Sequence, residues 1–252
     1  MLWLLLHNSV RGSLRIPTSR IPTSNMDDMG FLYTPLPPWF AVGAWIAAAG
    51  LLALALATRP FRRLQDATLQ HVWLALVVAV SVLWATNAWL EDGPVMHLLG
   101  ATLFVTLFDW ALALIAMAAV TGIAVVVFDA TWQGVALTFL VYGAMPVGVS
   151  AILQRASTAW LPRNLFVFVG TQGVVSPAIA VVAASAAAAG VHVGLANGSL
   201  AVVPAGYALS VVLLSLGESW FTGMATALIA VYRPTWVTTN DVRRYHLGGP
   251  RT

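Results

Sequence analysis

The sequence contains no cysteine, no lysine and few charged residues of either sign. The absence of cysteine excludes a disulfide framework, a thiolate metal cluster and a thiol nucleophile, so any metal must be bound through nitrogen or oxygen. Charged residues make up 8% of the chain, whereas about a quarter of the residues in soluble domains are charged. Hydrophobic residues make up 60%, and the mean hydropathy is +0.85. This composition is typical of a polytopic membrane protein.

Motifs for common enzymatic chemistry are also absent. The sequence has no phosphate-binding GxxxxGK[ST] loop, no HExxH or GxSxG motif and no EF-hand loop. The chain is therefore predicted not to be an enzyme, and energised transport would need a separate ATPase. An intramembrane enzyme that uses Glu218 ranks last, because the sequence offers no second catalytic group to converge with it.

Long apolar runs predict an all-α integral membrane protein. A span needs about 20 apolar residues, and five stretches meet this length: residues 39–57, 71–90, 133–153, 164–190 and 203–231. The stretch 97–128 is interrupted by Asp109, so it can be one span with a tail or two segments joined by a turn.

The arginines decide between these two alternatives. They occur in short runs between apolar segments, which indicates topology signals and not contacts with nucleic acid. The runs contain Arg59, Arg62, Arg63, Arg155, Arg163, Arg233, Arg243 and Arg244. All of them fall on one side of the membrane only if residues 97–108 and 110–128 are separate segments. We therefore predict about seven transmembrane helices, an external N-terminus and a cytoplasmic C-terminus.

The predicted segment 97–108 is too short to cross a membrane. Twelve residues of helix are about 18 Å long, and the hydrocarbon is about 30 Å thick. His97 or the turn at Asp109 must then lie below a membrane surface, where irregular backbone is tolerated only if protein buries it or it lines a cavity.

The chain is predicted to have four parts. Residues 1–25 contain two tandem copies of RIPTS and are interpreted as a disordered leader or a misassigned start, with Met26 or Met29 as the true start. Residues 26–38 form an external segment that folds into the bundle. The transmembrane bundle comprises residues 39–232, and residues 233–252 form a cytoplasmic tail.

A cation site is predicted where the external segment meets His97. Asp27 and Asp28 supply two carboxylates, and the prolines that follow them keep the segment extended and able to fold back. Two carboxylates and a neutral imidazole in a half-buried pocket would bind a divalent cation. The alternative for His97 is a helix cap or a hydrogen bond to a loop carbonyl.

Three other polar residues have different expected roles. Glu218 lies within the last span and is either a proton-relay or substrate group or a structural acceptor bonded to the N-terminus of a neighbouring helix. Asp109 is expected to be the polar turn between two short helices. His192 is expected in a solvated outward loop, without a role in binding.

Several stretches together resemble the CbiM/NikM-type permeases, the substrate-specific membrane subunits of energy-coupling factor transporters for cobalt and nickel. The resemblance is carried by HLLGATLF at His97, by ESWFTGMATALIAVYRPTWV at Glu218 and by DVRRYHL after it. LPRNLFVF at residues 161–168 is similar to a proteobacterial branch of the family. The resemblance covers most of the chain from Met26 onward and implies a seven-helix bundle with an external N-terminus inserted into it.

The resemblance also implies a set of metal ligands. In the family the ion is bound by the N-terminal amine, by the backbone amide and histidine side chain of the second residue, and by a histidine near the third helix. His97 matches the last of these, and Met26 matches the first. Asp27 stands where the family has its second-position histidine, and a carboxylate there makes the site harder and less suited to square-planar nickel.

Two functions follow from these observations. The first is a multi-pass permease subunit of the bacterial inner membrane that binds transported cobalt or nickel through His97, Met26, Asp27 and Asp28. It would work with an ATPase and a coupling transmembrane subunit, would contact membrane lipid but no nucleic acid, and would hold no tightly bound cofactor. The alternative is a membrane scaffold or assembly factor that keeps the permease fold without the metal site.

Overall fold

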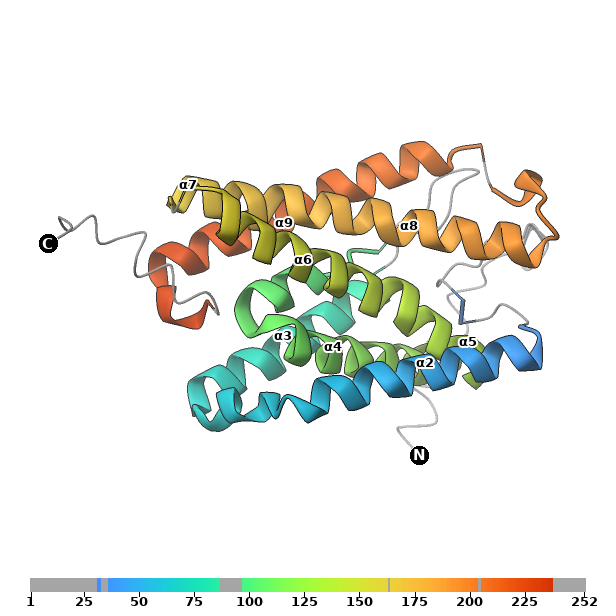
Figure 1. The fold of residues 1–252 in the computed structure, drawn as a ribbon, viewed down its shortest axis with the longest axis horizontal. Helices are drawn as coiled ribbons and strands as arrows, with labels where there is room; N and C mark the ends of the chain where they lie inside the picture. Colours follow the sequence, from blue (N-terminus) through green and yellow to red (C-terminus); the bar gives the residue numbers. More distant parts are fainter. Residues whose placement is uncertain (1–30, 33–35, 87–96, 163, 204, 238–252) are drawn as a thin grey trace, which may run out of the picture.

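The computed structural model describes residues 31–32, 36–86, 97–162, 164–203 and 205–237 (Figure 1). Within them the secondary structure is helical, without a strand. Six helical segments are long and apolar enough to cross a membrane: Pro38–Ala57, Ala67–Ala85, Ala101–Phe128, Trp132–Trp160, Leu165–Leu195 and Tyr207–Tyr232. The predicted all-α membrane fold is confirmed.

Arginine-containing turns gather at one end of the bundle, which we call the arginine end. The turn η1 (Pro60–Gln65) joins α2 (Pro38–Ala57) to α3 (Ala67–Ala85) there. Arg63 Nη2 in η1 donates to the carbonyl of Trp236, which follows α9 (Tyr207–Tyr232), at 3.3 Å. Figure 1 shows this turn, the start of α7 (Leu165–Phe168) and the end of α9 on the same side.

Helix α3 begins four residues before the predicted start of the second span. Its N-cap residue Asp66 accepts the backbone N–H groups of Thr68 at 2.8 Å and Leu69 at 3.4 Å. An aspartate at this position satisfies donors that the first helical turn leaves without partners. Hydropathy alone missed this start because Thr68 and Gln70 interrupt the apolar run in the first turn of α3.

Helix α4 (Ala101–Phe128) is two helices joined at Asp109. The φ and ψ angles of Asp109 are 68° and 167°, outside the helical range. Its Oδ1 accepts the N–H of Trp110 at 2.8 Å. The predicted turn at Asp109 is confirmed. The first piece, 101–108, is about 12 Å long, well short of a span, so the seven predicted segments correspond to the six long helices with α4 counted as two.

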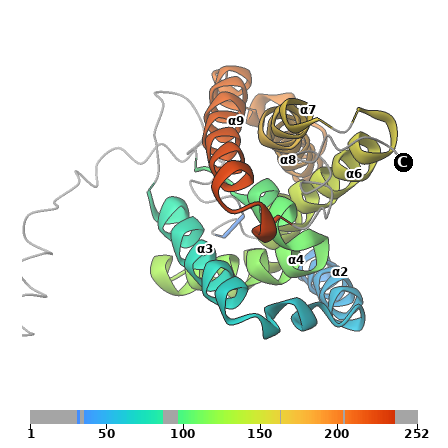
Figure 2. The ribbon, with the colours of Figure 1, turned by 90° about the vertical axis from the view of Figure 1, so that its left-hand side faces the viewer.

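The Asp109 turn lies at the arginine end. Burial lowers the pKa of the Arg63 guanidinium, and the negative charge of Asp109 opposes this shift. Helix α4 packs against α2, α3 and α6 (Met145–Trp160), and Figure 2 shows it among these helices. The start of α4 is thereby placed inside the protein.

Two π-helical turns precede prolines in the long helices. Residues Phe139–Ala144 (η2) join α5 (Trp132–Thr138) to α6, in which Pro146 occupies the first turn. Residues Val169–Val175 (η3) precede α8 (Ser176–Leu195), in which Pro177 does the same. Proline cannot donate to the carbonyl four residues earlier and collides with it, and a widened turn accommodates that defect without ending the helix.

Close backbone contact joins η3 to α9. A Cβ atom placed on Gly173 would lie 2.8 Å from the Cα of Gly223. Ser219 Oγ, one turn away on α9, donates to the carbonyl of Val174 at 2.9 Å. Small residues allow such close approach between membrane helices, because their association depends on packing and interhelical hydrogen bonds.

Candidate metal-binding site

His97 lies in a short stretch without regular secondary structure that leads into α4. Its side chain is 8% exposed, and its ring centroid lies 4.6 Å from that of Trp84 and 5.9 Å from that of Tyr142. Nδ1 is buried and has no hydrogen-bond partner among the described residues. A buried imidazole nitrogen with a free lone pair can act as a metal ligand.

Glu218 on α9 holds the two residues before α4. Its Oε2 accepts the N–H of Leu99 at 2.8 Å, and its Oε1 accepts the N–H of Gly100 at 2.7 Å. The carboxylate is 1% exposed. Both bonds go to donors at the positive end of a helix dipole, where a carboxylate is stabilised. This is the geometry of the structural acceptor, one of the two roles that the sequence left open.

Gly100 is required at the start of α4 for two reasons. Its φ is 68°, in the left-handed region that favours glycine. A Cβ atom here would also lie 2.7 Å from Cγ2 of Val80 on α3. The Trp84 indole N–H completes the support by donating to the carbonyl of Leu99 at 3.4 Å. The stretch that carries His97 is therefore fixed from both α3 and α9.

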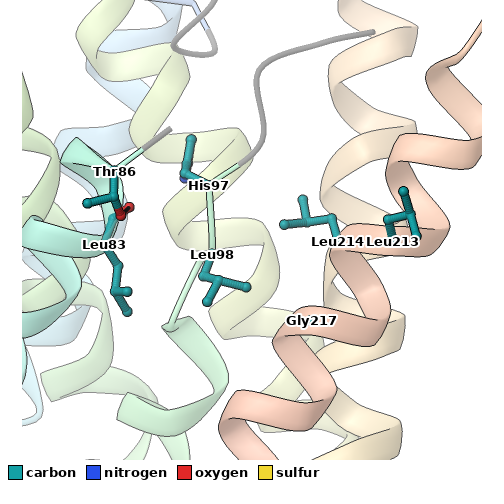
Figure 3. Close-up of a pocket in the computed structure, with 7 residues that line it drawn as sticks. All are labelled: Leu83, Thr86, His97, Leu98, Leu213, Leu214 and Gly217. Atoms are coloured by element: carbon teal, nitrogen blue, oxygen red, sulfur yellow. Dashed lines mark hydrogen bonds between the residues drawn. The ribbon is translucent and has the colours of Figure 1, made fainter. Parts of the chain in front are cut away.

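A cavity of about 210 Å³ opens beside His97. Figure 3 shows His97 and Leu98 between the end of α3 and the first half of α9. The lining consists of Leu83, Thr86, His97, Leu98, Leu213, Leu214 and Gly217. Apolar side chains form most of the wall, and His97 is the ionisable residue in it. The cavity thus brings an imidazole together with space for a small ligand.

Phe31 and Leu32 bring the N-terminal segment to the same region. Both side chains are buried, and the Phe31 ring lies 6.2 Å from Tyr142, the aromatic residue that also contacts His97. Met26, Asp27 and Asp28, the other predicted ligands, lie outside the described residues.

The expected position of His192 in a solvated loop is wrong. Helix α8 continues to Leu195, five residues beyond the predicted span, and places His192 in its last turn with 6% exposure. Its ring stacks on Phe31, with centroids 4.7 Å apart and an interplanar angle of 22°. Phe31 is distant in sequence, so local hydropathy around GVHVG could not reveal that the ring is covered.

The described residues contain no group of three or more histidine, aspartate or glutamate side chains placed to hold a metal ion. Each oxygen of the Glu218 carboxylate accepts a backbone N–H and so holds the stretch that carries His97. Within the described structure, His97 is therefore an incomplete coordination set.

Residues 34–236 match the CbiM family, which is described as the cobalt uptake substrate-specific transmembrane region. The chain belongs to the CbiM family. Comparisons with curated proteins and with solved structures gave no match. Membership confirms the resemblance seen at HLLGATLF and ESWFTG, and the match extends well beyond those two stretches.

Membership in the CbiM family shows the general function of the protein. The protein is a multi-pass membrane component of cobalt uptake, and its family consists of transporter components and not of enzymes. The buried imidazole and its cavity accordingly lie in a protein whose cargo is a transition-metal cation. The family match begins after Phe31 and Leu32, which makes the contacts of these two residues a separate structural observation.

Proposed function

We propose that this CbiM-family protein binds cobalt, or nickel, from the outer side of the bacterial inner membrane and passes it inward. The observation that carries the proposal is His97 Nδ1, a buried nitrogen without a hydrogen-bond partner among the described residues, beside a cavity. Imidazole is a good ligand for both metals. The chemistry requires a neutral ring, which a largely apolar cavity wall favours over a charged one.

The remaining ligands are proposed from the N-terminal segment. Asp28 lies three residues before Phe31, and Met26 lies five residues before Phe31. Extended chain spans about 3.3 Å per residue, so these residues lie within roughly 10 to 17 Å of Phe31. Phe31 and His97 both contact Tyr142. Met26, Asp27 and Asp28 are thus in reach of His97 and would complete a mixed nitrogen and oxygen site.

The proposed orientation places the arginine end in the cytoplasm and the N-terminal segment outside. The cytoplasmic bias of arginine supports it, as does the grouping of the η1 turn with the end of α9. A separate ATPase and a coupling membrane subunit would supply the energy for uptake, because the sequence contains no nucleotide-binding loop. The turns at 59–63 and 155–163 are candidate contacts for the coupling subunit.

The test is the metal content of purified protein. Protein begun at Met26 would be produced in cells with added cobalt and nickel, purified in detergent and analysed by elemental mass spectrometry. We expect close to one metal ion per chain, lost in His97→Ala. His71→Ala is the matched control, because His71 is exposed near the start of α3 and should not affect the metal. Equal losses in both variants would indicate nonspecific surface binding and contradict the proposal.

The second candidate function is a scaffold or assembly factor that keeps the fold without metal. Asp27, in place of the family's histidine, is the observation that favours it. Wild-type protein without metal after growth in both metals would support this candidate. Cobalt accumulation by cells that produce the chain with the ATPase and coupling subunits of a CbiM-type transporter would exclude it.

A further inference from the structure

One face of α5 holds the backbone of Phe31 and Leu32. The N–H of Phe31 donates to Thr138 Oγ1 at 3.1 Å, and Thr131 Oγ1 donates to the carbonyl of Leu32 at 3.1 Å. Gly134 lies between the two threonines, with spacings of three and four residues that put all three on one side of a helix. The backbones of two adjacent residues of the N-terminal segment are therefore bonded along that side.

Gly134 makes the close approach possible. A Cβ atom at this position would overlap the carbonyl oxygen of Phe31 and would lie 3.1 Å from the Cα of Leu32. Both are backbone atoms, so no side-chain rotation can relieve the collision. Any residue other than glycine here must displace the Phe31 and Leu32 backbone or α5 itself.

The side chains add a second set of contacts from another helix. Phe31 is 0% exposed and stacks on His192 of α8, while Leu32 is 1% exposed. Stacked aromatic rings stabilise their contact beyond the burial of area alone. Hydrogen bonds from Thr131 and Thr138 and ring stacking by His192 together hold Phe31 and Leu32 in place.

We infer that Thr131, Gly134, Thr138 and His192 form an intramolecular binding site for the N-terminal segment, which we call the seat. Retention of the ion at His97 depends on the seat, although none of its four residues belongs to the proposed ligand set. The dependence rests on the proposed function, since it concerns the same ion.

The physical basis of the dependence is chain connectivity. The proposed ligands Met26, Asp27 and Asp28 are three to five residues from Phe31, so the position of Phe31 limits where they can go. A fixed Phe31 removes much of the conformational entropy that these residues would otherwise lose when they close on an ion. By linkage, a bound ion also stabilises the seated segment.

The experiment measures cobalt affinity and seating in parallel. Cobalt binding would be measured by titration calorimetry on full-length protein in detergent. Seating would be measured as the rate at which a water-soluble maleimide labels Leu32→Cys, the single cysteine in an otherwise cysteine-free chain. Gly134→Ala is the main variant. Gly148→Ala on α6 is its matched control, because a Cβ atom there meets nothing within 4 Å.

We expect Gly134→Ala to weaken cobalt binding at least tenfold and to raise the labelling rate by a similar factor, while Gly148→Ala changes neither. Faster labelling with unchanged cobalt affinity would overturn the dependence of the ion on the seat. Unchanged labelling in Gly134→Ala would overturn the seat itself.

A milder pair of variants covers the case in which Gly134→Ala does not fold. Thr138→Val removes the acceptor for the Phe31 N–H, and Thr138→Ser keeps a hydroxyl group there. One buried hydrogen bond corresponds to about a fivefold change in affinity. We expect this loss in Thr138→Val and wild-type affinity in Thr138→Ser. Equal affinities in the two variants would contradict the inference.

The same design separates the seat from the proposed function. If wild-type protein binds no cobalt or nickel, the proposed function fails, and the labelling rates alone decide the seat. Faster labelling in Gly134→Ala than in Gly148→Ala would then support a seat without an ion, and equal rates would overturn it.

Discussion

Glu218 and Gly100 lie 118 positions apart in the sequence, and a hydrogen bond of 2.7 Å joins the carboxylate of one to the backbone N–H of the other. The bond connects the last membrane helix to the start of α4, three residues from His97. A carboxylate inside the bundle therefore serves the backbone that carries the proposed ligand.

Glu218→Gln should destabilise the protein and weaken cobalt binding. The amide can accept one backbone N–H but turns its own N–H₂ group toward the other, leaving a buried donor unsatisfied at a cost of about 1–3 kcal/mol. Thermal unfolding in detergent and calorimetric titration with cobalt would measure the two effects.

Asp66→Asn is the matched control for Glu218→Gln. Asp66 also accepts two backbone N–H groups at a helix start, but at an exposed N-cap where asparagine is about as good. Its unfolding temperature should be unchanged. If Glu218→Gln matched the wild type in stability and in cobalt affinity, Glu218 would not be needed to position the stretch that carries His97.

Gly100→Ala should destabilise the start of α4 by more than backbone conformation alone explains. Alanine at φ 68° costs about 1–2 kcal/mol, and its Cβ would also collide with Val80. Gly198→Ala has a positive φ of 85° and open space around the Cβ atom, so it should lose only the conformational part. Thermal unfolding of both variants would measure the difference.

A second substitution tests whether the collision with Val80 is real. Val80→Ala combined with Gly100→Ala removes the clashing methyl groups, so the double variant should lose less stability than the sum of the two single variants. If the stability losses of the two single variants simply added, Val80 would not be the residue that excludes a Cβ atom at position 100.

Gly173→Ala should separate η3 from α9. Its Cβ atom would lie 2.8 Å from the Cα of Gly223, and neither backbone can move without disturbing the bond from Ser219 to Val174. We expect a loss of several degrees in unfolding temperature, corresponding to about 1–3 kcal/mol. Gly170→Ala lies in the same π-helical turn with nothing near its Cβ atom, and it should be as stable as the wild type.

Asp109→Ala should be less stable than Asp109→Asn. Asparagine retains an acceptor for the Trp110 N–H, whereas alanine has none. The expected difference in unfolding free energy is about 0.5–1.5 kcal/mol, the value of one hydrogen bond. Equal stabilities, measured by chemical denaturation in mixed micelles, would contradict a stabilising role of this side-chain hydrogen bond.

The number of membrane segments and the break in α4 were predictable from the sequence. Span length and arginine placement fixed the number of segments and located the break at Asp109, because both depend on the bilayer and not on tertiary contacts. The true start of α3 could also have been predicted locally, since Asp66 is a strong N-cap residue shortly before the apolar run.

The contacts of the site were much less predictable. Glu218 could be identified as a buried carboxylate, but its partners at Leu99 and Gly100 come from another helix and give no pattern in the sequence. His192 was misassigned because the ring that covers it belongs to Phe31, at the other end of the chain. The need for glycine at position 134 arises from the same distant backbone.

The short first piece of α4 has an electrical consequence. A cation at His97 is separated from the Asp109 turn by only about 12 Å of helix, compared with about 30 Å of hydrocarbon. An ion that reaches this depth has crossed part of the membrane potential, which amounts to about 2.3 kcal/mol per charge at 100 mV. A divalent ion that enters from outside has crossed about six-tenths of the field at this depth, and the difference is roughly 3 kcal/mol. The resting voltage of the cell would thereby change the affinity of the site without any movement of the protein.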